Sequence, residues 1–410
     1  MKRIAIIGGG ISGLAALHYL KKRFAQNVDV TLYERNPYVG GCIATLETQG
    51  FLFETGPNSF LTNQPNTLEF IEELGFSDQM IEANKDAKRR YIQIKGKLHL
   101  LPAGPISFIK TPLLSTKDKF RLIGGLFIKN ISKDQSVYDY TSQRFGAAVT
   151  QRLVDPFLTG IYAGDIQRLH MASVFSKLWA AKGQKKKKTR LCTFKNGMGS
   201  FIKHLSQQHK ACIQTGIEIG NLEQIKADII ICSTPAYITS RLLNMDVLNR
   251  IPYAPVAVVG LVVKKNSLKN SPDGFGYLVP SQEGKEVLGV LLESNVFVRQ
   301  NKEEKMFIRI MLGGSRHPAI INDSTETILA KAMREIDEIY GFNERPLSAS
   351  VKLWPRGIPQ YELDYPVLRQ AIRDDLQKRP NLYLCANYLD GISFNDCIKN
   401  ARELIDRLVV

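Results

Sequence analysis

The chain has 410 residues, more than one simple hydrophobic core accommodates, so we expect two or three packed units. Hydrophobic residues make up 44% and charged residues 23%, which is typical of a globular protein and excludes a disordered or fibrous one. The formal net charge of +16 predicts an anionic partner. Because no nucleic-acid-binding motif accompanies this charge, we expect acidic lipid or a polyanionic ligand, not DNA or RNA.

The cysteines and the lengths of the apolar runs indicate in which cellular compartment the protein is expected. The six cysteines are scattered, without a CxxC pair and without metal-ligand spacing to histidine, so we expect free thiols and no metal site. No apolar run approaches the roughly eighteen residues of a membrane-spanning helix. The first predicted strand starts at residue 3, so we expect no signal peptide. These features together favour the reducing cytoplasm.

The opening segment predicts a strand, a glycine turn, a helix and a second strand. An apolar run over residues 3–7 leads into Gly8-Gly9-Gly10-Ile11-Ser12-Gly13, and leucines at helical spacing follow. The second strand, residues 28–33, ends at Glu34. In such a unit Gly8 permits the tight turn, Gly10 lets backbone amides approach a pyrophosphate, and Gly13 lets helix and strand pack closely.

Glu34 is placed to accept hydrogen bonds from ribose hydroxyls. The alternative is an ordinary glycine-rich turn, but the strand, the helix and the acid in this order favour a dinucleotide site.

The residues after Glu34 decide between FAD and NAD. Arg35 and the second glycine pair, Gly40-Gly41, resemble the FAD-containing amine oxidase superfamily, and residues 51–60 resemble the loop that touches the isoalloxazine end of the flavin. That superfamily usually has Arg or Lys where Cys42 stands. A covalent flavin link through Cys397 is the less favoured alternative to noncovalent FAD. The resemblance implies cofactor contacts from Gly8, Gly10, Ile11, Ser12, Gly13, Glu34, Arg35, Gly40, Gly41, Cys42, Gly56, Pro57, Asn58, Ser59, Trp354, Ile392, Ser393 and Phe394.

Further elements follow from periodicity and turn residues. Helices are predicted over residues 66–75, with Gly75 at the C-terminus, over 325–340, after Gly197, and at the end of the chain. Predicted strands cover 91–94 and 98–101 as a hairpin, and 227–233, 256–263, 306–312, 351–353 and 382–385.

The stretch from Pro105 to Lys133 differs in kind. Apolar residues such as Phe108, Phe120 and Phe127 are interleaved with lysines and one arginine, and only Asp118 and, just beyond the stretch, Asp134 oppose them. Apolar anchors with cations predict a segment that lies on an anionic membrane surface. The alternative is an ordinary amphipathic helix in a basic protein. The run Lys185–Lys188 predicts a solvated loop, with a lipid or acidic-substrate contact as the alternative.

Landmarks along the whole chain are more specific than the superfamily. The chain resembles the oxygen-dependent protoporphyrinogen oxidase and coproporphyrinogen III oxidase family at residues 54–60, 155–165, 274–280, 311–314, 358–361 and 387–397. The resemblance implies a six-electron oxidation of a porphyrinogen in haem synthesis, with O2 as acceptor and peroxide as product. It implies no catalytic side chain, because N5 of the flavin accepts hydride.

The same resemblance assigns the substrate site. Arg90 sits where the family places an arginine on a substrate propionate, with Arg89 as the alternative. Leu278 and Met311 correspond to the apolar side chains that sandwich the macrocycle, and plain core packing is their alternative. Gly160 and Ala163 resemble the small residues that let substrate lie close to backbone, and Phe275 borders the pocket.

One region departs from the family. Between the helix after Gly197 and the strand at 227–233, relatives carry more strands, one of which touches the adenosine half of FAD. Here only residues 211–226 remain, and we interpret residues 218–220 as the remnant. The shortening predicts a more open adenine pocket.

We predict an α/β fold with a Rossmann-type FAD-binding domain, a mixed-sheet substrate domain and a helical membrane-binding insertion. The FAD-binding domain takes residues 1–87, 191–245 and 361–410, the substrate domain 88–110 and 246–360, and the insertion 111–190. The predicted partners are a porphyrinogen, O2 and the anionic inner face of the cell membrane. The next enzyme of the haem pathway and a second copy of the chain are further candidates.

Protoporphyrinogen IX is favoured as the substrate because the 105–133 stretch suits an apolar molecule. Coproporphyrinogen III, which has four propionates, is the alternative that the net charge favours. Two rivals remain: another oxidoreductase of the amine oxidase type, marked by an aromatic cage at the flavin, and a catalytically silent flavin- and tetrapyrrole-binding protein.

Overall fold

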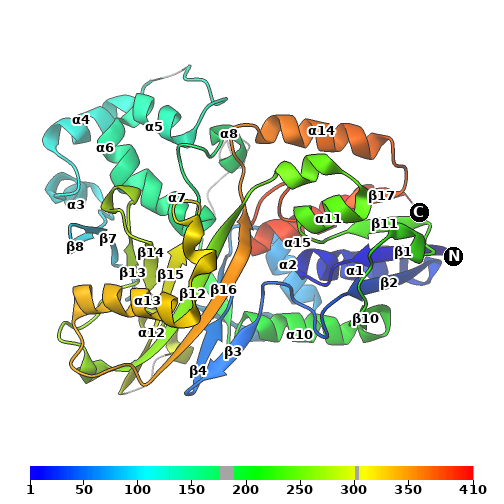
Figure 1. Ribbon diagram of the computed structural model, residues 1–410, viewed down its shortest axis with the longest axis horizontal. Helices are drawn as coiled ribbons and strands as arrows, with labels where there is room; N and C mark the ends of the chain where they lie inside the picture. Colours follow the sequence, from blue (N-terminus) through cyan, green and yellow to red (C-terminus); the bar gives the residue numbers. More distant parts are fainter. Residues whose placement is uncertain (129, 176–188, 301–303, 410) are drawn as a thin grey trace.

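The computed structural model describes residues 1–128, 130–175, 189–300 and 304–409. Figure 1 shows one sheet on the right, where both ends of the chain also lie, a second sheet on the left, and a group of helices above the second sheet. The predicted loop at Lys185–Lys188 lies outside the described residues.

The first sheet is parallel, and its strands come from three separate stretches of the chain. Its order is β10-β2-β1-β11-β17, formed by β1 (Lys2–Ile7), β2 (Val28–Glu34), β10 (Ile213–Thr215), β11 (Ile229–Cys232) and β17 (Leu382–Leu384). Isoleucines 4 and 6 of β1 face α1 (Ile11–Phe24), α2 (Pro65–Glu73), α10 (Met198–Gln208) and α15 (Phe394–Arg407). Ile7 faces α11 (Ala236–Leu243) and α14 (Tyr365–Gln377). Helices on both faces bury a parallel sheet, as the predicted Rossmann-type domain requires.

One prediction for this sheet was wrong. Residues 218–220 form no strand, and the short strand that survives in the shortened region is β10, where Thr215 pairs with Glu34. Gly220 instead lies in a turn in which its amide donates to Oε1 of Gln224. The alternation of Ile213, Gln214 and Thr215 suits a strand at the sheet edge, so β10 extends the sheet beside Glu34.

The second sheet is mixed, with the order β16-β12-β15-β14-β13-β7-β8. Its strands are β7 (Arg90–Ile94), β8 (Lys97–Leu100), β12 (Tyr253–Lys264), β13 (Gly276–Leu278), β14 (Val287–Leu291), β15 (Lys305–Gly313) and β16 (Ser348–Pro359). Helix α13 (Thr325–Tyr340) covers one face through Ile328, Ala332 and Ile336. The opposite face meets the hairpin β3 (Thr45–Thr48) and β4 (Phe51–Glu54), whose phenylalanines pack on Phe307.

β16 is much longer than the predicted strand at 351–353. Pro355 and Gly357 indicate an end to the strand in sequence, yet the strand runs on to Pro359. β16 is at the sheet edge, and its register against β12 shifts between Ala254 and Val256. Edges and bulges tolerate proline because its missing N–H is not needed there.

Residues 105–174, which follow β8 in the chain, are mainly helical. They contain α3 (Pro105–Lys110), α4 (Thr116–Gly125), α5 (Val137–Phe145), α6 (Ala147–Val149), a π-helical turn over Thr150–Val154, α7 (Asp155–Tyr162) and α8 (Met171–Val174). A small antiparallel sheet of β5 (Phe60–Leu61), β9 (Leu191–Phe194) and β6 (Met80–Glu82) lies beside the first domain, and α12 (Glu293–Val296) follows β14. Within the described ranges, no helix has the length and hydrophobicity to cross a bilayer.

The predicted fold class is confirmed, since the two sheets and the helical segment are all present, while membrane binding by that segment stays a prediction. The exact domain boundaries stay a prediction.

Candidate functional site

The glycine turn after β1 has the geometry expected of a phosphate cradle. Gly8 has a φ of +108°, and a Cβ on Gly13 would lie 2.1 Å from the carbonyl oxygen of Gly8, so both positions exclude a side chain. A Cβ on Gly10 would meet nothing within 4 Å. Gly10 begins α1 without a side-chain cap, and Ile11 and Ser12 form its buried first turn. The positive end of the helix therefore faces open space, which fits an anionic pyrophosphate.

Glu34 lies beside this turn, as predicted. Its Oε2 accepts a hydrogen bond from the amide of Gly9 at 2.8 Å, and its Oε1 accepts from the amide and side chain of Asn36 at 2.9 and 2.7 Å. A carboxylate has about four lone-pair positions, so acceptor capacity is left for ribose hydroxyls. Arg35 is exposed and makes no such contact with the turn.

The second glycine pair is brought against the first. The amide of Gly40 donates to the carbonyl of Gly9 at 2.8 Å, and Gly41 lies over the Cα of Gly10. Cys42 is exposed, and its carbonyl oxygen would lie only 2.0 Å from a Cβ on Gly56. We call Gly56 to Ser59, the half-buried part of the predicted loop at residues 51–60, the flavin loop; it begins against Cys42, next to the glycine pair.

Two more predicted contacts close around this loop. Nε1 of Trp354, on β16, donates to the carbonyl of Thr55 at 2.7 Å. Phe394 is the first residue of α15, and its ring centre lies 5.4 Å from that of Phe60. Ser393 caps α15 through Asp396, so its hydroxyl is engaged within the helix, and Ile392 just before it is half-buried. The amide of Ser393 also donates to Oδ2 of Asp396 at 3.2 Å, so both donors of this residue are engaged at the start of α15.

Four buried charged residues behind the loop were missed by the sequence reasoning. Glu54 pairs with Arg299 at 3.1 Å, and Glu293 lies 3.6 Å from Arg309. Burial raises the pKa of Glu54 and lowers the pKa of Arg309, although each has a partner of opposite charge. A signal was available: Arg309 is a cation within the apolar run of residues 306–312.

The predicted substrate residues share one face of the second sheet. Leu278 pairs with Gly289, and Gly289 pairs with Met311, so Leu278 and Met311 project from the same face with a glycine between them. Arg90 pairs with Gly276, two residues before Leu278, and therefore projects from that face as well. Leu278 and Met311 are only half-buried, and Cδ2 of Leu278 lies over Gly289, 2.8 Å from where a Cβ of that residue would be.

The structure favours Arg90 over Arg89 as the free cation. Nη1 of Arg89 pairs with Asp273 at 2.9 Å. The guanidinium of Arg90 lies 4.5 Å from the ring centre of Phe275, and no ion pair of the described residues includes it. Arg90 is exposed, and so is available to a carboxylate.

The two small residues are also near this face. A Cβ on Gly160 would lie 3.0 Å from Cδ2 of Leu278, so α7 packs against the predicted sandwich residue. Ala163 ends α7 with a φ of 49°, and its carbonyl accepts from the amide of Ser315, just beyond β15. Ala163, Met311 and Trp354 belong to one apolar cluster, which joins the substrate face to the flavin loop.

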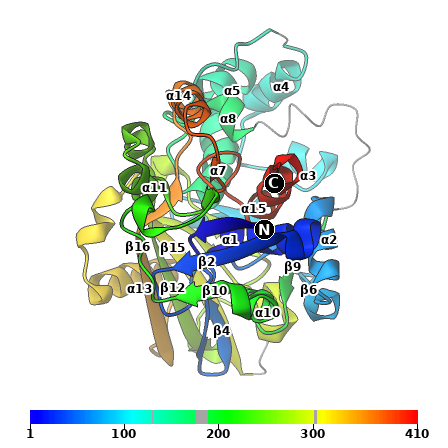
Figure 2. The ribbon, with the colours of Figure 1, turned by 90° about the vertical axis from the view of Figure 1, so that its right-hand side faces the viewer.

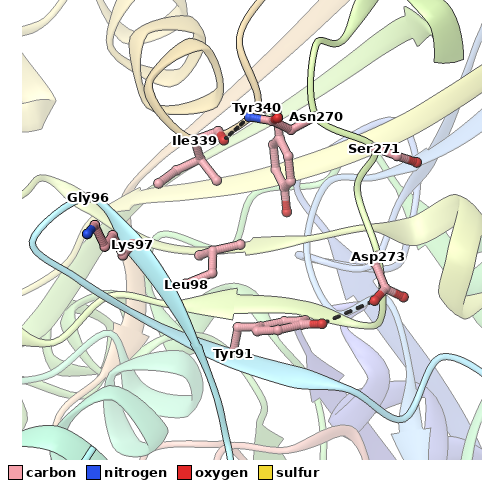
Figure 3. Close-up of a pocket in the computed structure, with 9 residues that line it drawn as sticks. All are labelled: Tyr91, Gly96, Lys97, Leu98, Asn270, Ser271, Asp273, Ile339 and Tyr340. Carbon is pink, nitrogen blue, oxygen red and sulfur yellow. Dashed lines mark hydrogen bonds between the residues drawn. The ribbon is translucent and has the colours of Figure 1, made fainter. Parts of the chain in front are cut away.

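A cavity of about 340 Å³ lies on the other face of the same sheet (Figure 3). It is lined by Tyr91, Leu98 and Tyr340 among others, and the hydroxyl of Tyr91 donates to Asp273 at 3.1 Å. Since side chains alternate along a strand, Tyr91 and Arg90 project to opposite faces. The cavity is therefore separate from the predicted substrate residues. Among the described residues, no group of three or more His, Cys, Asp or Glu side chains could hold a metal ion.

Comparisons with known proteins agree with this geometry. The family model for flavin containing amine oxidoreductases matches residues 11–404, so the chain belongs to that family and is a flavoprotein. Coproporphyrinogen III oxidase of Bacillus subtilis is 25% identical over 98% of this chain and 97% of its own. Protoporphyrinogen oxidase of Dictyostelium discoideum is 26% identical over 100% and 99%.

Solved structures share the fold. A protein from Exiguobacterium sp. 255-15, provisionally named protoporphyrinogen oxidase, has a TM-score of 0.86 at 21% identity, covering 99% of this chain and 98% of its own. UDP-galactopyranose mutase has a TM-score of 0.75 at 14% identity, covering 99% and 93%. The resemblance inferred from sequence motifs is confirmed.

Proposed function

We propose that this protein binds FAD noncovalently and oxidises a porphyrinogen to a porphyrin in haem biosynthesis, with O2 as the electron acceptor. The observation that carries the proposal is the single sheet face on which Arg90, Leu278 and Met311 project, joined through Ala163 and Trp354 to the flavin loop. Relatives named for both porphyrinogens match the chain over nearly its whole length.

In this proposal the chain holds the two molecules and contributes no catalytic acid, base or nucleophile. The amides at Gly10 to Gly13 receive the pyrophosphate, Glu34 receives the ribose, and Gly40, Gly41 and Gly56 to Ser59 lie along the rest of the cofactor. A bound flavin supplies the hydride acceptor. Arg90 pairs with a propionate, and Leu278 and Met311 contact the faces of the macrocycle.

The preferred substrate is protoporphyrinogen IX, and coproporphyrinogen III is the second candidate. Protoporphyrinogen has two propionates and an apolar macrocycle that suits Leu278 and Met311, and Arg90 and Lys352, which project from the same face, are cations that its propionates can pair with. The Bacillus relative named for coproporphyrinogen keeps the second candidate open to test.

We further propose that α3 and α4 dock on an anionic membrane surface. Ile106, Ile109, Phe120 and Phe127 expose 73%, 70%, 71% and 77% of their surface. Lysines 110, 117 and 119 lie among them. Such clustered apolar side chains are rare on a solvated surface, and the cations suit acidic headgroups. Phe157 and Ile161 of α7 are also exposed, next to Gly160 of the substrate face.

Anaerobic mixing tests the proposal. The FAD-loaded protein is mixed with protoporphyrinogen IX without oxygen, and flavin absorbance is followed. Bleaching is expected, since the flavin takes up the substrate electrons. Porphyrinogen binding without bleaching would favour the silent tetrapyrrole-binding protein, and bleaching by amines alone would favour another amine oxidoreductase.

A further inference from the structure

Arg309 is a buried cation in the centre of an apolar strand. Its exposed fraction is 5%, and its neighbours Ile308 and Ile310 are fully buried. Nη2 of Arg309 donates to the carbonyl of Gly56 at 2.5 Å, and Nη1 lies 3.6 Å from Oε1 of Glu293, which is wholly buried. Nη1 has no hydrogen-bond partner of its own, so the guanidinium is only partly satisfied. Burying a guanidinium that is only partly hydrogen-bonded costs free energy, so stability alone does not explain the position of Arg309.

The Arg309–Glu293 pair holds the flavin loop at two points. Arg309 binds the backbone at Gly56, and Oε1 of Glu293 accepts from Nδ2 of Asn58 at 3.1 Å. Oδ1 of Asn58 in turn accepts from the hydroxyl of Ser59 at 3.1 Å. The pair thus contacts the main chain at Gly56 and the side chain of Asn58, in a segment that is half-buried.

A second buried ion pair provides a comparison. Arg299 donates to Oε1 of Glu54 at 3.1 Å and to the carbonyl of Phe194 at 2.5 Å. It connects β4 to β9, whereas Arg309 connects β15 to the loop. Both pairs are buried in the same region, so removing the arginine of either pair is expected to lower the stability of the fold in a similar way. They differ in whether they contact Gly56 to Ser59.

We propose that Arg309 is a positioning residue of the flavin site, and that its pairing with Glu293 sets both the affinity for FAD and the flavin reduction potential. This inference rests on the proposed placement of FAD along Gly56 to Ser59. Reduction adds negative charge to a flavin, so a charge left unpaired behind the loop changes the free energy of the reduced flavin relative to the oxidised flavin. Loss of Arg309 leaves a buried carboxylate and disfavours reduction. Loss of the Glu293 charge leaves a buried cation and favours reduction.

Three variants test this inference: Arg309→Met, Glu293→Gln and both together. Apoprotein is titrated with FAD by flavin fluorescence, and the midpoint potential of the loaded protein is measured by equilibration with redox dyes. Arg309→Met is expected to bind FAD about tenfold more weakly. Its reduced-to-oxidised ratio at a fixed potential should fall about tenfold, which is about 30 mV for a two-electron couple. Glu293→Gln is expected to shift the potential in the opposite direction.

The double variant removes both charges, so its potential is expected to return toward that of the wild type while FAD binding stays weak. Arg299→Met is the matched control. It leaves Glu54 without its partner, so it should lower the thermal midpoint as Arg309→Met does but shift the flavin potential less, because Arg299 makes no contact with Gly56 to Ser59. If Arg309→Met does not fold, Glu293→Gln and Arg309→Lys carry the test.

Equal potentials in the Glu293→Gln variant, the Arg309 variant and wild type would overturn the inference, and so would an equal shift in Arg299→Met. None of these readouts uses a porphyrinogen, so the expected shifts in a protein that does not oxidise porphyrinogen would support the inference and reject only the substrate proposal. A wild-type chain that takes up no FAD would overturn both.

Discussion

Arg90 is the residue on which substrate affinity is expected to depend most. Charge-assisted hydrogen bonds contribute about 1.5–3 kcal/mol, so Arg90→Ala should raise KM for the porphyrinogen roughly 10- to 100-fold. The effect on kcat should be smaller, because the propionate lies away from the reacting carbon. Arg89→Ala is the control, since Arg89 is already paired with Asp273. Steady-state kinetics of both variants checks the assignment, and a larger effect at Arg89 would reverse it.

Alanine variants of Gly10 and Gly13 distinguish an effect on FAD binding from an effect on folding. A Cβ at Gly10 meets open space at a φ of −72°, so Gly10→Ala should fold with a stability within about 1 kcal/mol of wild type. Its methyl group would occupy the pyrophosphate cradle, so FAD affinity should fall at least about tenfold, about 1.4 kcal/mol. Gly13→Ala places a Cβ against the Gly8 carbonyl and should destabilise even the apoprotein, by about 1–3 kcal/mol.

Apoprotein melting and FAD titration of these two variants distinguish the cases. Equal losses of apoprotein stability would show that the Gly10 turn is structural and not a cradle.

The helix α4 and the segment after it are the element expected to contact membranes. Replacing Phe120 and Phe127 by serine removes two exposed aromatic side chains, each giving about 1.5–3 kcal/mol when buried in lipid. Binding to vesicles that contain anionic lipid should therefore fall at least about tenfold, and wild-type binding should weaken with salt. Val367→Ser on α14, also exposed, is the control. Co-sedimentation checks this, and equal binding by all three proteins would reject the membrane surface.

Elements with a strong local pattern could be predicted from the sequence, whereas the length of the edge strand β16 and the existence of the edge strand β10 could not. α13 begins and ends where its apolar period does, at Thr325 and Tyr340. β16 continues through Pro355 because its partner strand, not its own propensity, determines its length. β10 has three residues and exists only through pairing with β2, so the sequence alone gave no basis for preferring it to residues 218–220.

Some parts of the candidate site could likewise be predicted from the sequence, and others could not. The glycine turn and Glu34 are local features, and their geometry agrees with the prediction. The common face of Arg90, Leu278 and Met311 depends on strand register across three pairs of strands, which motifs could suggest but not establish. Glu293 and Arg309 are distant from Gly56 in sequence, so their contact with the flavin loop required the fold.

At the scale of the whole molecule, the parallel sheet is assembled from three distant stretches, and the proposed FAD site takes residues from the first and the last of them. FAD should therefore stabilise the fold well beyond its own pocket. At a free concentration 100 times Kd the cofactor contributes about 2.7 kcal/mol, so the thermal midpoint of loaded protein should exceed that of apoprotein. Calorimetry with and without FAD checks this, with adenosine diphosphate as the control ligand. An unchanged midpoint would contradict FAD binding to residues of both the first and the last stretch.

The most direct test of porphyrinogen oxidation is aerobic turnover of protoporphyrinogen IX and coproporphyrinogen III by the FAD-loaded protein, followed by porphyrin fluorescence and peroxide release. We expect oxidation faster than autoxidation, a preference for protoporphyrinogen, and about three peroxides per porphyrin, as six electrons passed to oxygen require. Fluorescence that rises no faster than autoxidation with both substrates would contradict the proposed function.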